Sequence, residues 1–87
     1  MTIVIYTKDY CPYCARAKSL LKRKGVAFTE IDITHDEMLQ KEMVEKSSGR
    51  KTVPQIFIGG TSIGGADDLY ALDSAGKLDG MLTDKNA

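Results

Sequence analysis

The sequence contains two cysteines, Cys11 and Cys14, in the stretch Cys-Pro-Tyr-Cys. Thiols at this spacing occur in metal sites, in structural disulfides and in redox pairs. A disulfide between them closes a very small loop, so it restricts the unfolded chain little and adds little stability. A tetrahedral zinc site needs four ligands, whereas the chain adds a single histidine, His35, to the two cysteines. These counts favour a redox pair, while a metal site shared by two chains and an inert pair remain as alternatives.

The expected position of Cys11 at the start of a helix also favours redox chemistry. Pro12 suits the first helical position, where its missing N–H costs nothing, so Cys11 becomes the N-cap. Free N–H groups of the first turn then point at the Cys11 sulfur, and cysteines so placed titrate at about 3.5–7.5 rather than about 8.5. Lys8 can add a positive charge nearby. Cys14 lies one turn further in, within disulfide distance and less exposed. The sequence therefore predicts a nucleophile and a resolving partner.

The apolar pattern predicts the elements that must position these thiols. Strands are expected at residues 2–6, 28–33, 55–58 and 61–63, with a two-residue hairpin turn at Gly59 and Gly60. A first helix is expected from Pro12 to the residue before Gly25. A second is expected to begin with a capping box, in which Thr34 is the N-cap and Glu37 its partner, and to end at about 47–49. A third is expected from Asp67 or Asp68 to Gly76. The order β-α-β-α-β-β-α predicts an α/β fold, with a four-stranded mixed sheet flanked by three helices. Residues 83–87 are expected to fray.

Composition limits the classes of function. The 87 residues, 43% of them apolar, suit a single domain spanning residues 1–87. Twelve basic and twelve acidic residues cancel, so neither nucleic acid nor an anionic membrane is an expected partner. The start of the chain lacks the features of a signal peptide, and no apolar run is long enough to span a membrane. We therefore expect a cytoplasmic protein, in a compartment where thiols stay reduced and a Cys-x-x-Cys pair is more often catalytic or metal-binding than structural.

Three motifs together resemble those of the glutaredoxins. Cys-Pro-Tyr-Cys at 11–14 follows an expected buried strand, Thr-Val-Pro stands at 52–54, and Gly-Gly-Ala-Asp-Asp-Leu stands at 64–69. The order and spacing match those of small bacterial-type glutaredoxins over nearly the whole chain. The resemblance implies a thioredoxin-like fold and a glutathione-dependent thiol–disulfide oxidoreductase. Ala66 stands where many such proteins have a third cysteine, so a side disulfide through that position is not expected.

The resemblance also implies roles for single residues. Cys11 would attack a glutathione mixed disulfide and keep the glutathione, and Cys14 or a second glutathione would resolve that intermediate. Pro54 would be a cis-proline that turns the Val53 backbone toward the cysteinyl part of glutathione. Backbone N–H groups at Ala66 and Asp67 would meet the γ-glutamyl carboxylate. The implied glutathione-binding residues are Lys8, Tyr13, Lys41, Thr52, Val53, Pro54, Gly65, Ala66 and Asp67, with glutathione as co-substrate and no metal expected.

The implied partners are glutathione and glutathionylated or disulfide-containing proteins, with ribonucleotide reductase as one candidate, and the protein is expected to be a monomer. Two other functions remain open. The protein could be a dedicated electron donor to one partner, recharged by thioredoxin reductase. Alternatively, a dimer could hold a [2Fe–2S] cluster through Cys11 of each chain and two glutathiones, although the Pro12 ring crowds such a site.

Overall fold

The computed structural model describes residues 2–82 and contains four strands and four helices within that range. The strands are β1 (Ile3–Thr7), β2 (Thr29–Asp32), β3 (Gln55–Ile58) and β4 (Thr61–Gly64). The helices are α1 (Pro12–Arg23), α2 (Glu37–Lys46), α3 (Ala66–Ser74) and α4 (Leu78–Leu82). The order and type of the predicted elements are confirmed, and α4 is an addition. The predicted fraying of 83–87 concerns residues outside the described range.

The strands form one mixed sheet in the order β2-β1-β3-β4. β1 pairs in parallel with β2 and antiparallel with β3, and β3 pairs antiparallel with β4. Gly59 and Gly60 have φ of 57° and 83°, the left-handed values that a two-residue hairpin turn requires and that glycine adopts without strain. The predicted mixed sheet and hairpin are therefore confirmed.

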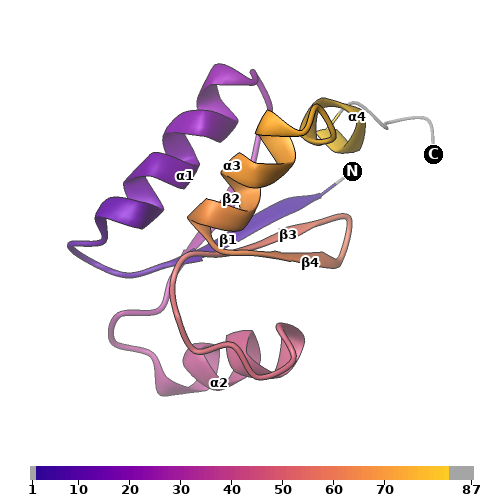
Figure 1. Ribbon diagram of the computed structural model, residues 1–87. Coiled ribbons are helices and arrows are strands. Elements are labelled where there is room, and N and C mark those ends of the chain that lie inside the picture. The colour runs from indigo at the N-terminus through magenta and orange to yellow at the C-terminus, as the bar shows by residue number, and fades with distance from the viewer. Residues whose placement is uncertain (1, 83–87) are drawn as a thin grey trace.

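Helices cover both faces of the sheet, which makes three layers (Figure 1). α1 and α3 lie on one face with α4 beside α3, while α2 lies alone on the other. Successive residues of a strand point to opposite faces, so β1 sends Ile3 and Ile5 toward α1 and α3, and Tyr6 toward α2. The larger core, on the α1 side, includes Leu20, Leu69 and the α4 leucines.

The smaller core under α2 contains a polar contact. Tyr6 is buried and its hydroxyl donates to Glu42 at 2.7 Å. Lys46, one turn further along α2, lies 3.5 Å from the same hydroxyl. Burial, above all, raises the pKa of Tyr6, and the hydrogen bond to Glu42 acts in the same direction. The contact ties α2 to the sheet at a position where a buried hydroxyl needs a partner.

The structure corrects two predicted helix caps. The N-cap of α2 is Asp36, whose carboxylate accepts the Leu39 N–H at 3.0 Å, and not Thr34. Thr34 instead accepts the Asp9 N–H at 2.9 Å and donates to Asp32, so its hydroxyl serves the neighbouring loop.

The second correction concerns α3, which was predicted to start at Asp67 or Asp68. It starts at Ala66, and its N-cap is Gly65.

Candidate active site

Cys11 is the N-cap of α1, as predicted. Its backbone is extended, with φ −113° and ψ 98°, and Pro12 follows as the first helical residue. The Cys11 sulfur accepts the Cys14 N–H at 3.1 Å, which satisfies one of the donors left free at a helix start. A hydrogen-bond donor and the positive end of the helix dipole therefore face the sulfur atom, and both favour negative charge there.

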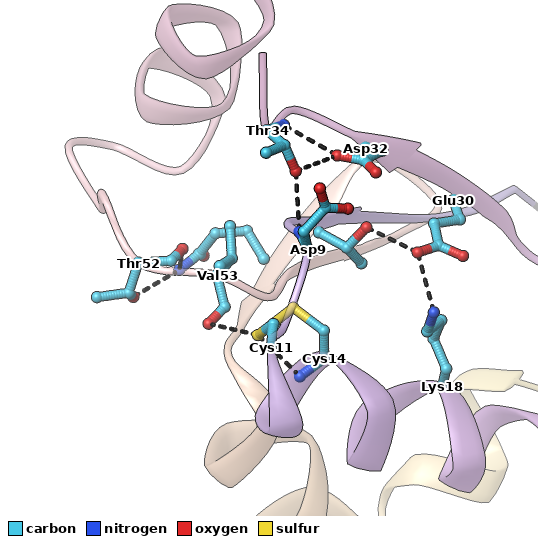
Figure 2. The surroundings of a disulfide bond; sticks show 11 residues. Asp9, Cys11, Cys14, Lys18, Glu30, Asp32, Thr34, Thr52 and Val53 are labelled. Carbon is cyan, nitrogen blue, oxygen red and sulfur yellow. Dashed lines mark hydrogen bonds and ion pairs between the residues drawn. A yellow bond between two sulfur atoms is a disulfide. The ribbon is translucent and has the colours of Figure 1, made fainter. Parts of the chain in front are cut away.

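The two cysteines form a disulfide, with their Cα atoms 5.1 Å apart (Figure 2). Cys14 is 2% exposed, whereas Cys11 is partly exposed. The predicted asymmetry between an accessible outer sulfur and a buried inner one is confirmed. The pair can open by attack on the accessible sulfur and close again through the buried one.

Hydrogen bonds fix the turn that leads from β1 into Cys11. The Thr34 hydroxyl accepts the Asp9 N–H, and the Asp32 carboxylate accepts the Thr34 N–H at 2.9 Å (Figure 2). The hydrogen bond from the Thr34 hydroxyl, followed by that from its backbone N–H, lowers the pKa of Asp32. Tyr10, which follows Asp9 in this turn, is fully exposed and has a φ of 51°. The hydrogen bonds of Asp9 and Thr34 therefore hold the turn, while the exposed Tyr10 side chain does not cover Cys11.

A second segment, residues 52–55, borders the Cys11 sulfur from the opposite side. The Val53–Pro54 peptide bond is cis, as the resemblance implied, and the Val53 carbonyl oxygen lies 3.8 Å from the Cys11 sulfur (Figure 2). Gln55, fully buried at the start of β3, donates to the Thr52 carbonyl at 3.0 Å and to its hydroxyl at 3.2 Å. The buried Gln55 amide thus anchors the segment through Thr52, and the Val53 backbone lies beside the Cys11 sulfur.

A groove of about 500 Å³ begins at this segment. Three stretches of chain line it: the start of α1, the segment 50–54 and the start of α3. Its lining residues are Tyr13, Arg50, Thr52, Val53, Pro54, Gly65, Ala66, Asp67 and Asp68. Seven of the nine residues implied for glutathione therefore meet in one groove.

An ion pair bridges the two walls of this groove. Arg50 donates to Asp68 at 3.0 Å, and the same carboxylate oxygen accepts the Gly65 N–H at 2.9 Å. That N–H, and Arg50 after it, hold the pKa of Asp68 below its usual value. Gly64 has φ 111°, and a Cβ there would collide with the Asp68 and Arg50 side chains. The neighbouring Asp67 is exposed and has no ion-pair partner among residues 2–82. One carboxylate is therefore neutralised and the other stays available.

The remaining two predicted residues, Lys8 and Lys41, lie in a different groove. It has a volume of about 580 Å³, runs along α2 and also contains Lys51. Lys51 directly precedes Thr52 in the chain, so the two grooves are neighbours. The structure brings Lys8 and Lys41 together with a third lysine, but not with the residues around Asp67.

Sequence reasoning missed Arg50, Asp68, Gln55 and Lys51. Gln55 had a visible signal, since it is the polar residue in the otherwise apolar stretch 55–58. Asp68 was visible only as part of the motif at 64–69 and as a candidate helix start. Its ion pair with Arg50 had no signal, because a contact between residues 18 positions apart depends on the tertiary fold.

Residues 2–82 show neither a metal-binding cluster nor a membrane-spanning helix. Residues 2–82 hold no group of three or more histidine, cysteine or acidic side chains placed to bind a metal ion. Within the same range, no helix has both the length and the apolar character to cross a membrane.

A disulfide at the start of the helix that follows the first strand of a mixed sheet is typical of thiol–disulfide oxidoreductases with a thioredoxin-like fold. Residues 3–63 match the family model described as Glutaredoxin. The chain is 58% identical to glutaredoxin 3 of Escherichia coli strain K12 over 80 residues. The matched residues make up 92% of this chain and 95% of the E. coli protein. The chain belongs to the glutaredoxin family, and Cys11 and Cys14 are its redox pair.

Solved structures agree with this assignment. The solution structure of glutaredoxin from Brucella melitensis is 57% identical, with a TM-score of 0.83 over 94% of this chain and 88% of that one. The crystal structure of a buckwheat glutaredoxin–glutathione complex is 35% identical, with a TM-score of 0.87 over 98% of this chain and 79% of that one. The predicted thioredoxin-like fold and oxidoreductase class are confirmed.

Proposed function

We propose that this protein uses glutathione to reduce glutathione mixed disulfides and protein disulfides. The observation that carries the proposal is the groove that starts beside the Cys11 sulfur and ends at the start of α3. Glutathione is a peptide with a thiol in the middle and an α-amino acid group at one end. The buckwheat glutaredoxin of similar fold was crystallised as a complex with glutathione.

The chemistry assigns one step to each sulfur. In the reduced protein, the Cys11 thiolate attacks the glutathione sulfur of a mixed disulfide. The old S–S bond breaks, and the substrate sulfur leaves as a thiolate and takes up a proton. Glutathione then remains bound to Cys11 through a new S–S bond.

Two routes complete the cycle. A second glutathione thiolate can attack the bound glutathione sulfur, which releases oxidised glutathione and restores the Cys11 thiolate. Alternatively, the Cys14 thiolate attacks the Cys11 sulfur and displaces glutathione, which forms the Cys11–Cys14 disulfide seen in this structure. Two further glutathione thiolates then reduce that disulfide in turn and leave as oxidised glutathione, which restores both cysteine thiols. The second route needs both cysteines. Reduction of a protein disulfide by a single molecule of this protein, without glutathione in the exchange, needs both as well.

The groove supplies complementary groups along the length of glutathione. The Val53 backbone lies where an extended peptide can pair with it as an added strand. At the α3 end, the Ala66 and Asp67 N–H groups of the first helical turn suit a carboxylate. The exposed Asp67 carboxylate suits the ammonium of the same γ-glutamyl group.

The other end of the ligand carries the glycine carboxylate, for which Lys8, Tyr13 and Lys41 are the proposed partners. Lys8 and Lys41 lie together in the groove along α2, which is separate from the groove that contains Asp67. Thr52, Pro54 and Gly65 complete the binding residues as parts of the walls.

We further propose that residues 1–87 form a single domain that acts as a monomer in the cytoplasm. Its protein partners would be glutathionylated or disulfide-containing proteins, ribonucleotide reductase among the candidates. No resident metal is part of the proposed cycle.

A coupled assay tests the proposal. The protein is mixed with a glutathione mixed disulfide, reduced glutathione, glutathione reductase and its nicotinamide cofactor, and consumption of that cofactor is followed. We expect turnover that saturates with the mixed disulfide. Absence of turnover, together with rapid reduction by thioredoxin reductase, would overturn glutathione dependence in favour of a dedicated electron donor.

A further inference from the structure

Arg16 contacts two aromatic rings, one of which, Tyr13, lines the candidate groove. Its guanidinium carbon is 5.7 Å from the centre of the Tyr13 ring and 5.0 Å from the centre of the Tyr70 ring. A guanidinium within about 6 Å of a ring centre is attracted by the negative face of the ring. We call Tyr13, Arg16 and Tyr70 the stack.

The stack connects the two helices that form the groove walls. Tyr13 belongs to the first turn of α1, and Arg16 follows it by three residues, so both lie on one face of that helix. Tyr70 belongs to α3, three residues after Asp67. The contacts therefore run from one groove wall, through a charge, to the other.

Hydrogen bonds fix the far end of the stack. The Tyr70 hydroxyl donates to the Arg16 carbonyl oxygen at 3.1 Å and accepts from the Arg23 guanidinium at 3.4 Å. Tyr70 is partly buried, whereas Tyr13 is 54% exposed. The stable partner in the stack is thus Tyr70, and the ring that needs support is Tyr13.

Tyr13 stands where such support matters for binding. It lines the groove with Val53, Pro54 and Asp67, and it lies between the two cysteines in the sequence. A half-exposed ring that is mobile before binding must lose rotational freedom when the ligand arrives, and that loss weakens affinity. A ring already held by a cation loses less.

We propose that Arg16 is a positioning residue that holds the Tyr13 ring in place as a wall of the glutathione groove. This inference rests on the proposed function, because it assigns Tyr13 to ligand binding. Arg16 acts through Tyr13 and touches neither sulfur nor glutathione in this role. Its loss should therefore change KM and leave kcat and the reactivity of Cys11 unchanged.

The kinetic test compares Arg16→Gln with the wild type on one glutathione mixed disulfide. An exposed cation–π contact of ordinary strength corresponds to a two- to fivefold change in affinity, so we expect KM to rise about two- to fivefold. Lys22→Gln is the matched control, since it removes a cation from the same helix at an exposed position outside the stack. Arg16→Lys keeps the charge without the planar group and should give an intermediate KM.

A double-mutant comparison shows whether the effect passes through Tyr13. In a Tyr13→Leu background, Arg16→Gln should have no further effect on KM. An equal effect in both backgrounds would overturn the proposal, as would a shifted pH profile of Cys11 alkylation, because either would show that the Arg16 charge acts directly.

An NMR measurement separates this inference from the function on which it rests. In Arg16→Gln, the Tyr13 ring proton shifts should move toward those of an unrestrained tyrosine, without any glutathione present. Unchanged shifts would overturn the inference even if the wild type reduces mixed disulfides. An inactive wild type would instead overturn the proposed function, while the ring shifts would still report on the stack.

Discussion

The start of α1 and the groove beside it differ in how far apart their parts lie along the chain. Cys11, Pro12 and Cys14 fall within four consecutive residues, and the hydrogen bond to the Cys11 sulfur comes from within that stretch. The groove instead combines Tyr13 with segments around residues 50–54 and 65–68. The sulfur chemistry therefore depends on one helix start, whereas the recognition of a ligand depends on the whole fold.

This difference has a consequence for stability and function. A helix start keeps its geometry as long as the helix persists. The groove walls also need the Arg50–Asp68 ion pair, the Gln55 anchor and the packing of α3. Substitutions at the helix start should affect the chemical steps, and substitutions in the groove should affect binding.

The largest expected effect is the loss of a sulfur at the helix start. Cys11→Ser should abolish reduction of both glutathione mixed disulfides and protein disulfides, because the buried Cys14 is not accessible to substrates. Cys14→Ser should keep the reduction of glutathione mixed disulfides, since a second glutathione can finish the exchange. It should lose most reduction of protein disulfides.

Two assays on the same preparations, one for each substrate class, check this prediction. Equal loss of the glutathione activity in Cys11→Ser and Cys14→Ser would show that the roles of the sulfurs are assigned wrongly. Zinc bound stoichiometrically by the wild type and lost in both variants would support a metal site instead.

The next effect concerns the reactivity of Cys11 in the reduced protein. The Cys14 N–H and the helix dipole favour a thiolate, so alkylation by iodoacetamide should already be rapid at neutral pH. The midpoint of its pH–rate profile should lie at least about one unit below about 8.5, the value of an ordinary cysteine. A midpoint at or above that value would contradict the helix-end argument. Cys14→Ser keeps the backbone donor and isolates the Cys11 signal.

Local elements were the parts that the sequence predicted well. Pro12 after Cys11 defined the helix start, and the Gly59–Gly60 pair defined the hairpin, because each depends on backbone preferences of adjacent residues. The predicted N-cap of α2, Thr34, was wrong because a hydroxyl can bond to more than one neighbouring segment. Thr34 and Asp36 were both suitable cap residues, and contacts to Asp9 and Asp32 engage the Thr34 hydroxyl elsewhere.

Tertiary features were not predictable from the pattern. α4 has five residues and includes Gly80; a helix so short is unstable by itself, and it forms because Leu78 and Leu82 pack into the larger core. The separation of Lys8 and Lys41 from the Asp67 end of the site also follows from the course of α2 and the segment after it. Motifs indicated which residues to expect in the binding site, but not how they divide between two grooves.

Within the groove, Asp67→Ala should give the largest change. A charge-assisted hydrogen bond is typically worth about 1.5–3 kcal/mol, so KM for a glutathione mixed disulfide should rise roughly tenfold or more. Asp73→Ala is the control, because Asp73 lies on the same helix and pairs with Lys24 outside the groove. Unchanged kinetics in Asp67→Ala would exclude this carboxylate from binding and strengthen the dedicated-donor alternative.

The smallest expected effect is on stability and comes from Asp68. Its carboxylate accepts the Gly65 N–H and pairs with Arg50, so Asp68→Asn, which keeps an acceptor oxygen but removes the charge, should lower the free energy of unfolding by up to about 1 kcal/mol, the range of exposed ion pairs. Arg50→Gln should cost less, because the N–H contact, which is the larger cause of the lowered pKa, remains.

The sign of the pH dependence distinguishes this contact from a packing effect. The pKa of folded Asp68 lies below its usual value of 3.8, so the contribution is complete above that value and is lost as the pH falls through the folded pKa. The difference between wild type and Asp68→Asn, measured by urea unfolding, should therefore be constant from about pH 7 to about pH 5 and shrink in more acidic solution. A difference that persists unchanged in acid would mean that the carboxylate charge is not its source. The groove walls would then be held by packing and by hydrogen bonds that do not need the charge, and the contrast with the charge-dependent helix start would be sharper.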